Sequence, residues 1–295
     1  MAGRVHHVVL AGVALVALGL VSGCSRHKSP VPTGILEGDR YLFDRATELM
    51  GRKKWLQARE HYRQLVDNYP QSNFRPDAKL GLGDTYLGEN TIESLVLAQN
   101  EYREFLTFYP TNARADYAQL KLGLSHFQQM QSADRDQTET KEAVAELTLF
   151  VERYPQSSLI VEGRQKLREA RTRLTDAQFH VGYFYYRTRW YPGAVDRFKA
   201  VLKDDPEFPH RDAVYYYLGD ALLKGGRRAE GLPYLDRAMK EFPDSAFAVL
   251  AKRSMDAPPP EMVPDPKAEK KARAAEKKAM AAEEKKRRAE EKKKK

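Results

Sequence analysis

The sequence predicts an all-α protein, an α-solenoid built from about five divergent helix pairs. Three observations predict it: a short phrase ending in proline recurs, apolar residues precede each copy at helical spacing, and small residues stand at fixed distances before each proline. The spacings between the prolines are 40, 45, 51 and 37 residues. The copies are LVDNYP, FLTFYP, FVERYP, VLKDDP and AMKEFP, which end at Pro70, Pro110, Pro155, Pro206 and Pro243. A drifting period of this length is typical of stacked repeats with insertions.

The first copy of the phrase shows the apolar pattern that predicts each helix pair. Ala58, Tyr62, Leu65 and Val66 fall at i, i+4, i+7 and i+8 and form one apolar stripe of a helix. Proline ends that helix because it lacks an amide hydrogen and clashes with the preceding turn. A partner stripe lies upstream, at residues 42–50, and the glycine of GRKKW allows a short turn. Two such helices cannot bury their apolar faces alone, so neighbouring pairs must stack.

Counting back from the prolines matches the tetratricopeptide pattern of small, alanine, large apolar and proline positions. The first, fourth and fifth copies are on phase, whereas Gly83 and Gly123 come three and eight residues early in the second and third. The polar stretches GENTIES, at 88–94, and QSADRDQTET, at 131–140, lie in these gaps. We therefore expect longer loops between helices there. A generic helical bundle with chance prolines is the alternative, and five in-phase prolines disfavour it.

An additional apolar stripe follows Pro155 and continues into the fourth repeat. We expect one long helix from about Ser158 to Arg187. This helix would link an N-terminal half with three repeats, residues 35–157, to a C-terminal half with two repeats, residues 158–253.

The N-terminal residues predict export and lipidation. Residues 8–21 carry no charge, but this run is shorter than the roughly 20 residues that a spanning helix needs. It suits the apolar region of a signal peptide at residues 1–23. The sequence Val-Ser-Gly before Cys24 resembles the bacterial lipobox, in which the cysteine is lipidated (with palmitate or a similar acyl chain) and becomes the mature N-terminus. We expect lipid at Cys24, the single cysteine of the chain, and a tether at 24–34. The alternative is an ordinary signal peptide that is cut near a cysteine.

The C-terminal residues 254–295 differ in composition from the repeats. Five prolines fall within the first 13 residues of this tail, and a Lys/Glu/Ala-rich stretch without a core face follows. We expect a disordered segment or a solvated helix. The tail supplies most of the net charge of +9, because residues 261–295 hold 14 Lys and Arg against 8 Asp and Glu. The charge therefore says little about the folded part, and no nucleic-acid partner is expected.

Motifs for catalysis are missing from the sequence. The seven histidines are scattered, and no HExxH, GxGxxG, P-loop or GxSxG pattern occurs. The GLGD stretch at Gly81 lies inside a helical repeat, where glycine allows helices to approach closely. We expect no enzyme activity, no cofactor and no metal.

A peptide-binding groove is the expected functional feature. In stacked repeats of this kind, the first helix of each pair lines a concave surface at fixed positions. In the first two repeats, the residues that we select as groove residues are Phe43, Thr47, Met50, Leu80, Asp84 and Leu87. In the fourth repeat the same positions hold Asp176, Phe179, Tyr183 and Tyr186, within an aromatic-rich stretch. Apolar positions with few charges suit an extended peptide with hydrophobic side chains, and the alternative is that these side chains form core between repeats.

The lipobox, the linker and the five repeats together resemble the BamD family, lipoproteins of the outer-membrane β-barrel assembly machine. Three stretches carry the resemblance: WLQAREHYRQLVDNYPQSNFRPDAKLGLGDTYL, DYAQLKLGLSHF followed by DRDQT, and FHVGYFYYRTRWYPGAVDRFKAVLKDDP. It covers about Cys24 to Arg253. The Lys/Glu/Ala tail and the final repeat depart from the family pattern.

The resemblance implies a non-enzymatic scaffold that is lipid-anchored on the periplasmic face of the outer membrane. It implies that the C-terminal half docks onto a periplasmic domain of the barrel subunit BamA, and Arg197 matches a family arginine at that contact. It implies that the N-terminal half recognises the C-terminal signal of unfolded barrel proteins, beside other assembly lipoproteins. The alternative is a periplasmic repeat lipoprotein of another system, such as a cell-division coordinator or a pilus or secretin pilotin.

Overall fold

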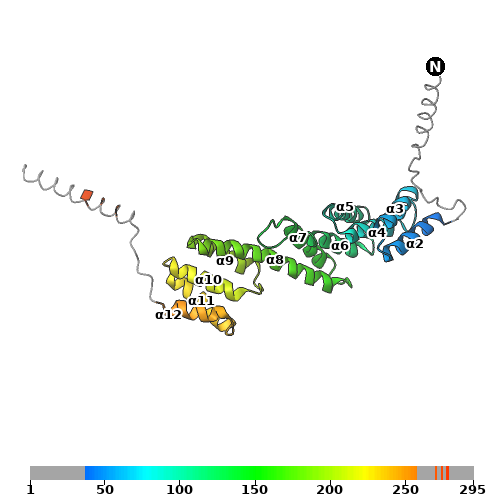
Figure 1. The fold of residues 1–295 in the computed structure, drawn as a ribbon. Coiled ribbons are helices and arrows are strands. Elements are labelled where there is room, and N and C mark those ends of the chain that lie inside the picture. Colours follow the sequence, from blue (N-terminus) through cyan, green and yellow to red (C-terminus); the bar gives the residue numbers. More distant parts are fainter. Residues whose placement is uncertain (1–36, 258–269, 271–273, 275–276, 279–295) are drawn as a thin grey trace, which may run out of the picture. The chain divides into compact units, whose positions relative to one another are not determined.

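The computed structural model describes residues 37–257 and four isolated residues at 270, 274, 277 and 278. Residues 37–257 form eleven helices and no strand (Figure 1), which confirms the predicted all-α class. These helices belong to two compact units, residues 1–88 and 89–295. The predicted division into repeat halves at 157 and 158 stays a prediction. None of the helices in the described residues is long and apolar enough to cross a membrane.

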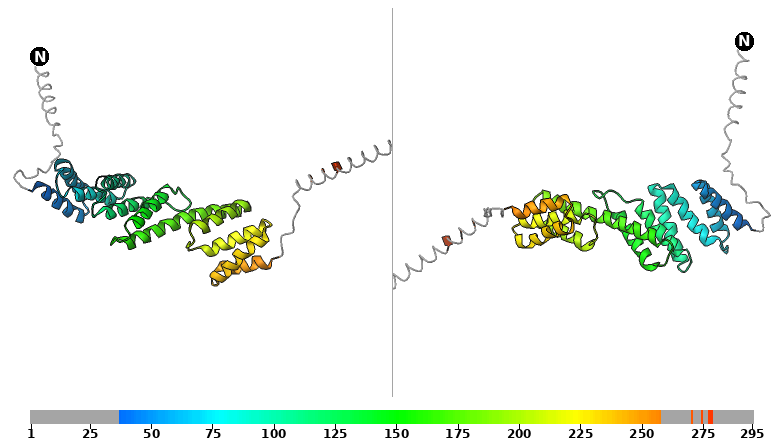
Figure 2. Two further views of the ribbon diagram at one scale, coloured as in Figure 1. Left: turned by 180° about the vertical axis from the view of Figure 1, so that it is seen from behind. Right: turned by 90° about the horizontal axis from the view of Figure 1, so that it is seen from below.

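The first unit holds three helices, and the second unit holds eight. The helices of the first unit are α2 (Gly38–Gly51), α3 (Trp55–Asn68) and α4 (Arg75–Glu89). Those of the second are α5 (Ile92–Phe108), α6 (Ala115–Phe127), α7 (Thr138–Arg153), α8 (Ile160–Arg187), α9 (Tyr191–Asp204), α10 (Arg211–Lys224), α11 (Arg228–Glu241) and α12 (Ala246–Asp256). Within the second unit, consecutive helices pack against one another in chain order, as two further views show (Figure 2).

The prolines of the recurring phrase set the ends of five helices. The helices α3, α5, α7, α9 and α11 each end two residues before their proline. The residue before a proline is pushed out of the α region, so the helix ends there. In each case the backbone amide of that residue still closes a last bond to a carbonyl inside the helix, as from Tyr69 to Leu65 at 3.0 Å.

Glycines allow helices of neighbouring pairs to approach closely. In the first unit, a Cβ atom at Gly81 would lie 2.6 Å from the ring of Tyr62. In the second unit, a Cβ atom at Gly163 would lie 2.2 Å from the ring of Phe150, which is completely buried. Glycine is therefore required by the packing at these two crossings.

The interior of each unit is a series of apolar clusters between neighbouring helices. The cluster of the first unit is centred on Leu42, Ala46, Ala58 and Leu65. In the second unit, one cluster gathers around Leu147 and Phe150, and others gather around Phe198 and Leu235. All four of these side chains are fully buried.

A serine and an aspartate tie successive first helices together. Ser157 Oγ accepts from the amide of Leu159 at 3.1 Å, at the start of α8, and donates to Asp116 Oδ2 at 2.5 Å, in the first turn of α6. The same two bonds recur in both units. They join Ser72 to Asp39, and Ser245 to Asp212. Each link satisfies an orphan amide at a helix start and fixes the neighbouring helix against it.

Helix α8 is the long helix that the sequence predicts. It has 28 residues and begins at Ile160, two residues after the expected start, and it ends at Arg187 as expected. Leu167 in its first half packs with residues of α6 and α7, and Phe179 in its second half packs with residues of α9 and α10. One uninterrupted helix therefore serves two consecutive helix pairs.

Two local expectations need comment. The prediction of a long loop at residues 88–94 is wrong, because α4 extends to Glu89 and α5 begins at Ile92. Thr91 and Ser94 form a reciprocal capping box, with bonds of 2.8 and 3.1 Å, that starts α5 a turn earlier than the phase suggests. The second loop is confirmed, because no helix lies between Phe127 and Thr138.

Helix α12 was not anticipated from the sequence. Ser245 caps it by accepting from Phe247 N at 3.1 Å, and Ala248 and Ala251 bury its inner face. The predictions for the signal peptide, Cys24 and the tether lie outside the described residues, as does nearly all of the tail.

Candidate functional site

The groove positions predicted on α2 lie together on one face of that helix. Phe43 stacks on Phe74, with centroids 5.2 Å apart and planes at 20°, and it meets Tyr62 at 5.9 Å. Thr47 is exposed; its Oγ1 donates to the Phe43 carbonyl at 2.9 Å and lies 3.2 Å from the Tyr62 hydroxyl. Met50 is half-buried and packs on the same cluster. Of these residues Thr47 is therefore the one whose side chain is mostly accessible.

The predicted groove positions on α4 differ in exposure. Leu80 is 0% exposed and belongs to the interior of the structure. Asp84 and Leu87 are half-buried. Next to them on α4, Thr85 accepts from Arg59 Nε at 3.1 Å, and the Arg59 guanidinium lies 3.8 Å from the Tyr86 ring centroid. Apolar and cationic groups thus meet on the first unit.

Arg197, the predicted partner-binding residue, is exposed on α9 in the second unit. Its Nη1 donates to Gln178 Oε1 on α8 at 3.3 Å, which is at the long end of hydrogen-bond geometry. A weak bond to a neutral amide leaves most of the donor capacity of the guanidinium for a carboxylate of another molecule.

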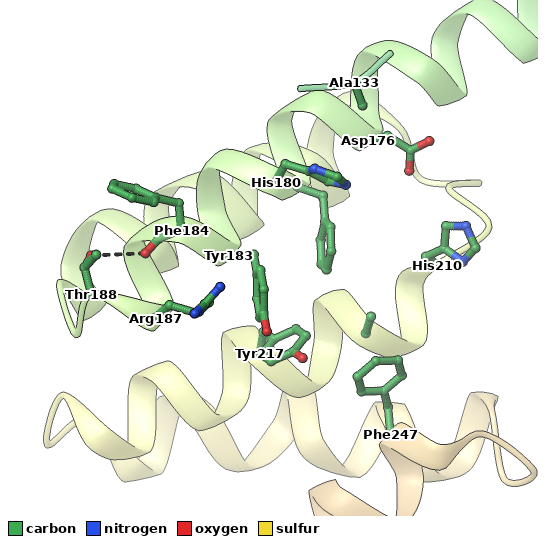
Figure 3. A pocket seen from close by; sticks show the side chains of 12 residues that line it. Ala133, Asp176, His180, Tyr183, Phe184, Arg187, Thr188, His210, Tyr217 and Phe247 are labelled. Atoms are coloured by element: carbon green, nitrogen blue, oxygen red, sulfur yellow. Dashed lines mark hydrogen bonds between the residues drawn. The ribbon is translucent and has the colours of Figure 1, made fainter. Parts of the chain in front are cut away.

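The second unit also contains a cavity of about 870 Å³, which we call the aromatic cavity. Helix α8 forms one wall and α10 with α12 forms the other, while Ala133 contributes from the loop before α7 (Figure 3). Its aromatic lining residues come from all three helices. They are Phe179, Tyr183 and Phe184 on α8, Tyr217 on α10 and Phe247 on α12.

Two ring pairs of the aromatic cavity, both involving Tyr217, pack edge to face. Tyr183 and Tyr217 lie 5.0 Å apart at 60°, and Tyr217 meets Phe247 at 5.7 Å and 63°. Burial, together with the neighbouring Tyr183, raises the pKa of Tyr217 to about 12. Tyr217 therefore stays a neutral hydroxyl at physiological pH.

Charged groups stand at the two ends of the aromatic cavity (Figure 3). At one end, Asp176 lies near His180 and His210. Burial raises the pKa of Asp176, and the two imidazoles and Arg173 oppose that shift. At the other end lies Arg187, and within the part of the chain that the structure describes no hydrogen bond or ion pair engages its guanidinium.

Tyr186 is the one predicted fourth-repeat position that faces elsewhere. Its hydroxyl donates to Asp220 Oδ2 at 2.5 Å and accepts from Lys224 Nζ at 2.7 Å. Burial and the bonded carboxylate raise its pKa. Asp220 also accepts from Ser254 Oγ of α12 at 2.8 Å. This polar cluster joins three helices and has a structural role.

The repeat positions thus locate Asp176, Phe179 and Tyr183 but miss the opposite wall of the cavity. Tyr217 falls outside the lining positions of the repeat pattern, and Phe247 belongs to the unanticipated α12. The density of aromatic residues after position 183 was the signal that could have pointed here. Among the described residues, no group of three or more His, Cys, Asp or Glu side chains could hold a metal ion.

Helix pairs with small residues at their crossings define this chain as a tetratricopeptide-repeat protein, and the model of that repeat matches residues 213–245. The model of the YfiO family, described as outer membrane lipoprotein, matches residues 37–224. The chain belongs to this family, which confirms the resemblance to BamD proteins.

Three curated relatives are each named outer membrane protein assembly factor BamD. That of Caulobacter vibrioides is 26% identical over 220 residues, which cover 74% of this chain and 70% of the relative. That of Vibrio cholerae is 25% identical, covering 65% of this chain and 82% of the relative. That of Rickettsia prowazekii is 22% identical, covering 81% and 94%. A solved structure, the crystal structure of MamA protein, covers 77% of this chain at 18% identity with a TM-score of 0.31.

Proposed function

We propose that this protein is a lipid-anchored, non-enzymatic scaffold that assembles β-barrel proteins into the outer membrane, and that it acts from the periplasmic face. The family match over residues 37–224 carries this proposal, supported by curated relatives that are named assembly factors. Stacked helix pairs expose grooves and helix faces suited to gripping other polypeptides.

The anchor is Cys24, which follows an apolar run and two small residues. Two or three acyl chains, at about 0.8 kcal/mol per buried methylene, hold a protein on a bilayer durably. Mass spectrometry of the purified mature protein should find an acylated N-terminal cysteine, and Cys24→Ala should leave the protein unprocessed or soluble.

Arg197 is the proposed contact with a BamA-like subunit. Its exposure on α9 and its single weak bond to Gln178 leave the guanidinium ready to pair with a carboxylate. Arg197→Glu should weaken binding to that subunit at least tenfold, which corresponds to about 1.4 kcal/mol, because the new carboxylate would face the partner carboxylate that Arg197 pairs with. Lys203→Glu, an exposed change on the same helix, is the matched control. Normal co-purification of the Arg197 variant would exclude this contact.

The face of α2 and α4 that carries Phe43, Thr47, Met50, Asp84 and Leu87 is the proposed groove for unfolded barrel proteins, with Leu80 supporting it from within. Thr47→Arg places a long cation on the accessible position without removing a core side chain. It should weaken binding of a peptide copied from the C-terminal strand of a barrel protein. Gln57→Arg on α3, also exposed, is the control.

The decisive test of the whole proposal is depletion. After the protein is depleted, the amount of folded barrel protein in the outer membrane should fall while lipoproteins of other systems remain. Unchanged barrel levels would assign the chain to another repeat-lipoprotein system.

A further inference from the structure

The aromatic cavity of the second unit is open to a ligand and separate from the surfaces proposed above. It is lined by α8, α10 and α12, whereas Arg197 lies on α9 and the six residues selected as groove residues lie on the first unit. Five aromatic side chains line it, and Phe184 is 61% exposed. The other four rings are partly buried, and together with Phe184 they give the cavity a largely apolar lining.

The spacing of side chains along α8 gives the register of a ligand. Phe179, Tyr183 and Arg187 follow one another at intervals of four residues, and all three line the cavity. Four helical residues advance by about 6 Å, and two residues of an extended chain advance by about 6.6 Å. Alternate side chains of an extended peptide lie on one face, so they can meet Arg187, then Tyr183, then Phe179 in turn.

The charges around the cavity indicate which group of a ligand would bind Arg187. At the far end of the cavity, Asp176 already faces His180, His210 and Arg173. Arg187 has no opposite charge among the described residues, so an anionic group is the complementary ligand. Thr188 continues the lining beyond Arg187. Because the lining extends past Arg187, a bound chain can continue beyond the guanidinium. The group that pairs with Arg187 is therefore an acidic side chain within the chain and not a terminal carboxylate.

We propose that the aromatic cavity binds an extended segment of another polypeptide with the pattern acidic–x–aromatic–x–aromatic. The carboxylate pairs with Arg187, the first ring packs against the cavity side of Tyr183 and Tyr217, and the second ring packs near Phe179 and Phe247. Phenol and phenyl rings supply apolar area with defined edge-to-face geometry, and the guanidinium supplies two parallel donors for the carboxylate.

The test uses the full chain and a fluorescent peptide with both ends blocked, Ser-Glu-Ser-Phe-Ser-Tyr-Ser, made also in reversed order. At least one order should bind. Replacing its Glu by Gln should weaken binding about tenfold, as expected for a hydrogen-bonded charge pair. Inserting one serine between Glu and Phe should weaken it comparably, because the insertion turns the carboxylate to the other face. Binding that is indifferent to both changes, or that requires an unblocked C-terminus, would overturn the proposal.

Variants of the protein complete the test. Arg187→Glu should lose about tenfold in affinity for the Glu peptide and should prefer a peptide with Lys in place of Glu. This charge reversal would not occur if the variant were simply misfolded. Arg164→Glu, an exposed change on the same helix, should leave binding unchanged. Absence of the reversal would overturn the assignment of Arg187 as the anchor.

A photo-reactive residue in place of Phe184 identifies what occupies the cavity. Crosslinking to the added peptide supports the proposal. A crosslink within one chain to its own residues 258–295, or between two copies of the chain, that the peptide cannot displace would overturn it. Because none of these readouts involves a barrel subunit, the result is independent of the proposed scaffold function.

Discussion

Arg168 and Asp205, which are 37 residues apart, form a two-point ion pair between α8 and the end of α9. Nη1 donates to Oδ1 at 2.8 Å, Nη2 donates to Oδ2, and Thr175 Oγ1 donates to Oδ2 at 3.3 Å. Asp205 is 5% exposed and stands where the other four copies of the recurring phrase have an aromatic residue before proline. An ion pair therefore replaces a ring at this repeat.

Removing the arginine should destabilise the second unit. Arg168→Met leaves the Asp205 carboxylate buried without its cation, and we expect a loss of about 2 kcal/mol, less than for a fully buried pair because Arg168 is partly exposed. The chain has two tryptophans, so in a Trp55→Phe background Trp190 reports urea unfolding of this unit. Arg164→Met should change the unfolding free energy by less than about 0.5 kcal/mol. Equal effects of the two changes would contradict this role.

The same pair should give the stability a defined dependence on pH. Burial raises the pKa of Asp205, but the hydrogen bonds and the charge of Arg168 outweigh it, and the net pKa lies below the usual range. A carboxyl with a lowered folded pKa contributes stability above its unfolded pKa of about 3.9, and loses it as pH falls through the folded pKa. The difference in unfolding free energy between the parent and Arg168→Met should therefore shrink from pH 7 to pH 3. A constant difference would show that the carboxylate charge is not involved.

The serine–aspartate links should each stabilise a helix start. Ser157→Ala removes the acceptor of the Leu159 amide and the donor to Asp116, and should cost about 1 kcal/mol. Ser158→Ala, one residue along and exposed, serves as the control. Both can be compared by urea unfolding followed at Trp190. A loss equal to that of the control would show that water replaces the link without cost.

Glycine at position 163 should be required by packing rather than by backbone conformation. Gly163→Ala places a Cβ atom against the buried ring of Phe150 and should destabilise the second unit by about 1–3 kcal/mol. Gly51→Ala, at the end of α2, meets nothing within 4 Å and should be neutral or stabilising by up to about 1 kcal/mol. Thermal unfolding at matched protein concentration separates the two outcomes. Tolerance at Gly163 would mean that Phe150 can move aside.

The repeat pattern predicts second helices well because proline acts locally. Pro70 and its four equivalents end their helices through their own covalent geometry, which no tertiary contact needs to supply. The start of α5 was mispredicted because the Thr91–Ser94 capping box adds a turn that the repeat phase does not encode. Helix α12 is short and lies after the last proline phrase, so it had no marker of its own.

The binding surfaces could be predicted only where one helix determines them. Phe179 and Tyr183 follow from their repeat positions, whereas Tyr217 and Phe247 reach the same cavity only after three helices have packed. Leu80 shows the converse, because a position on the expected lining is fully buried in the structure. Position along a repeat thus predicts the face of a helix better than the exposure of a single side chain.

The unbroken length of α8 has a mechanical consequence. Its 28 residues make a rod of about 42 Å, held at one end by α6 and α7 and at the other by α9 and α10. A torque applied to the later helices would be carried to the earlier ones without a joint to absorb it.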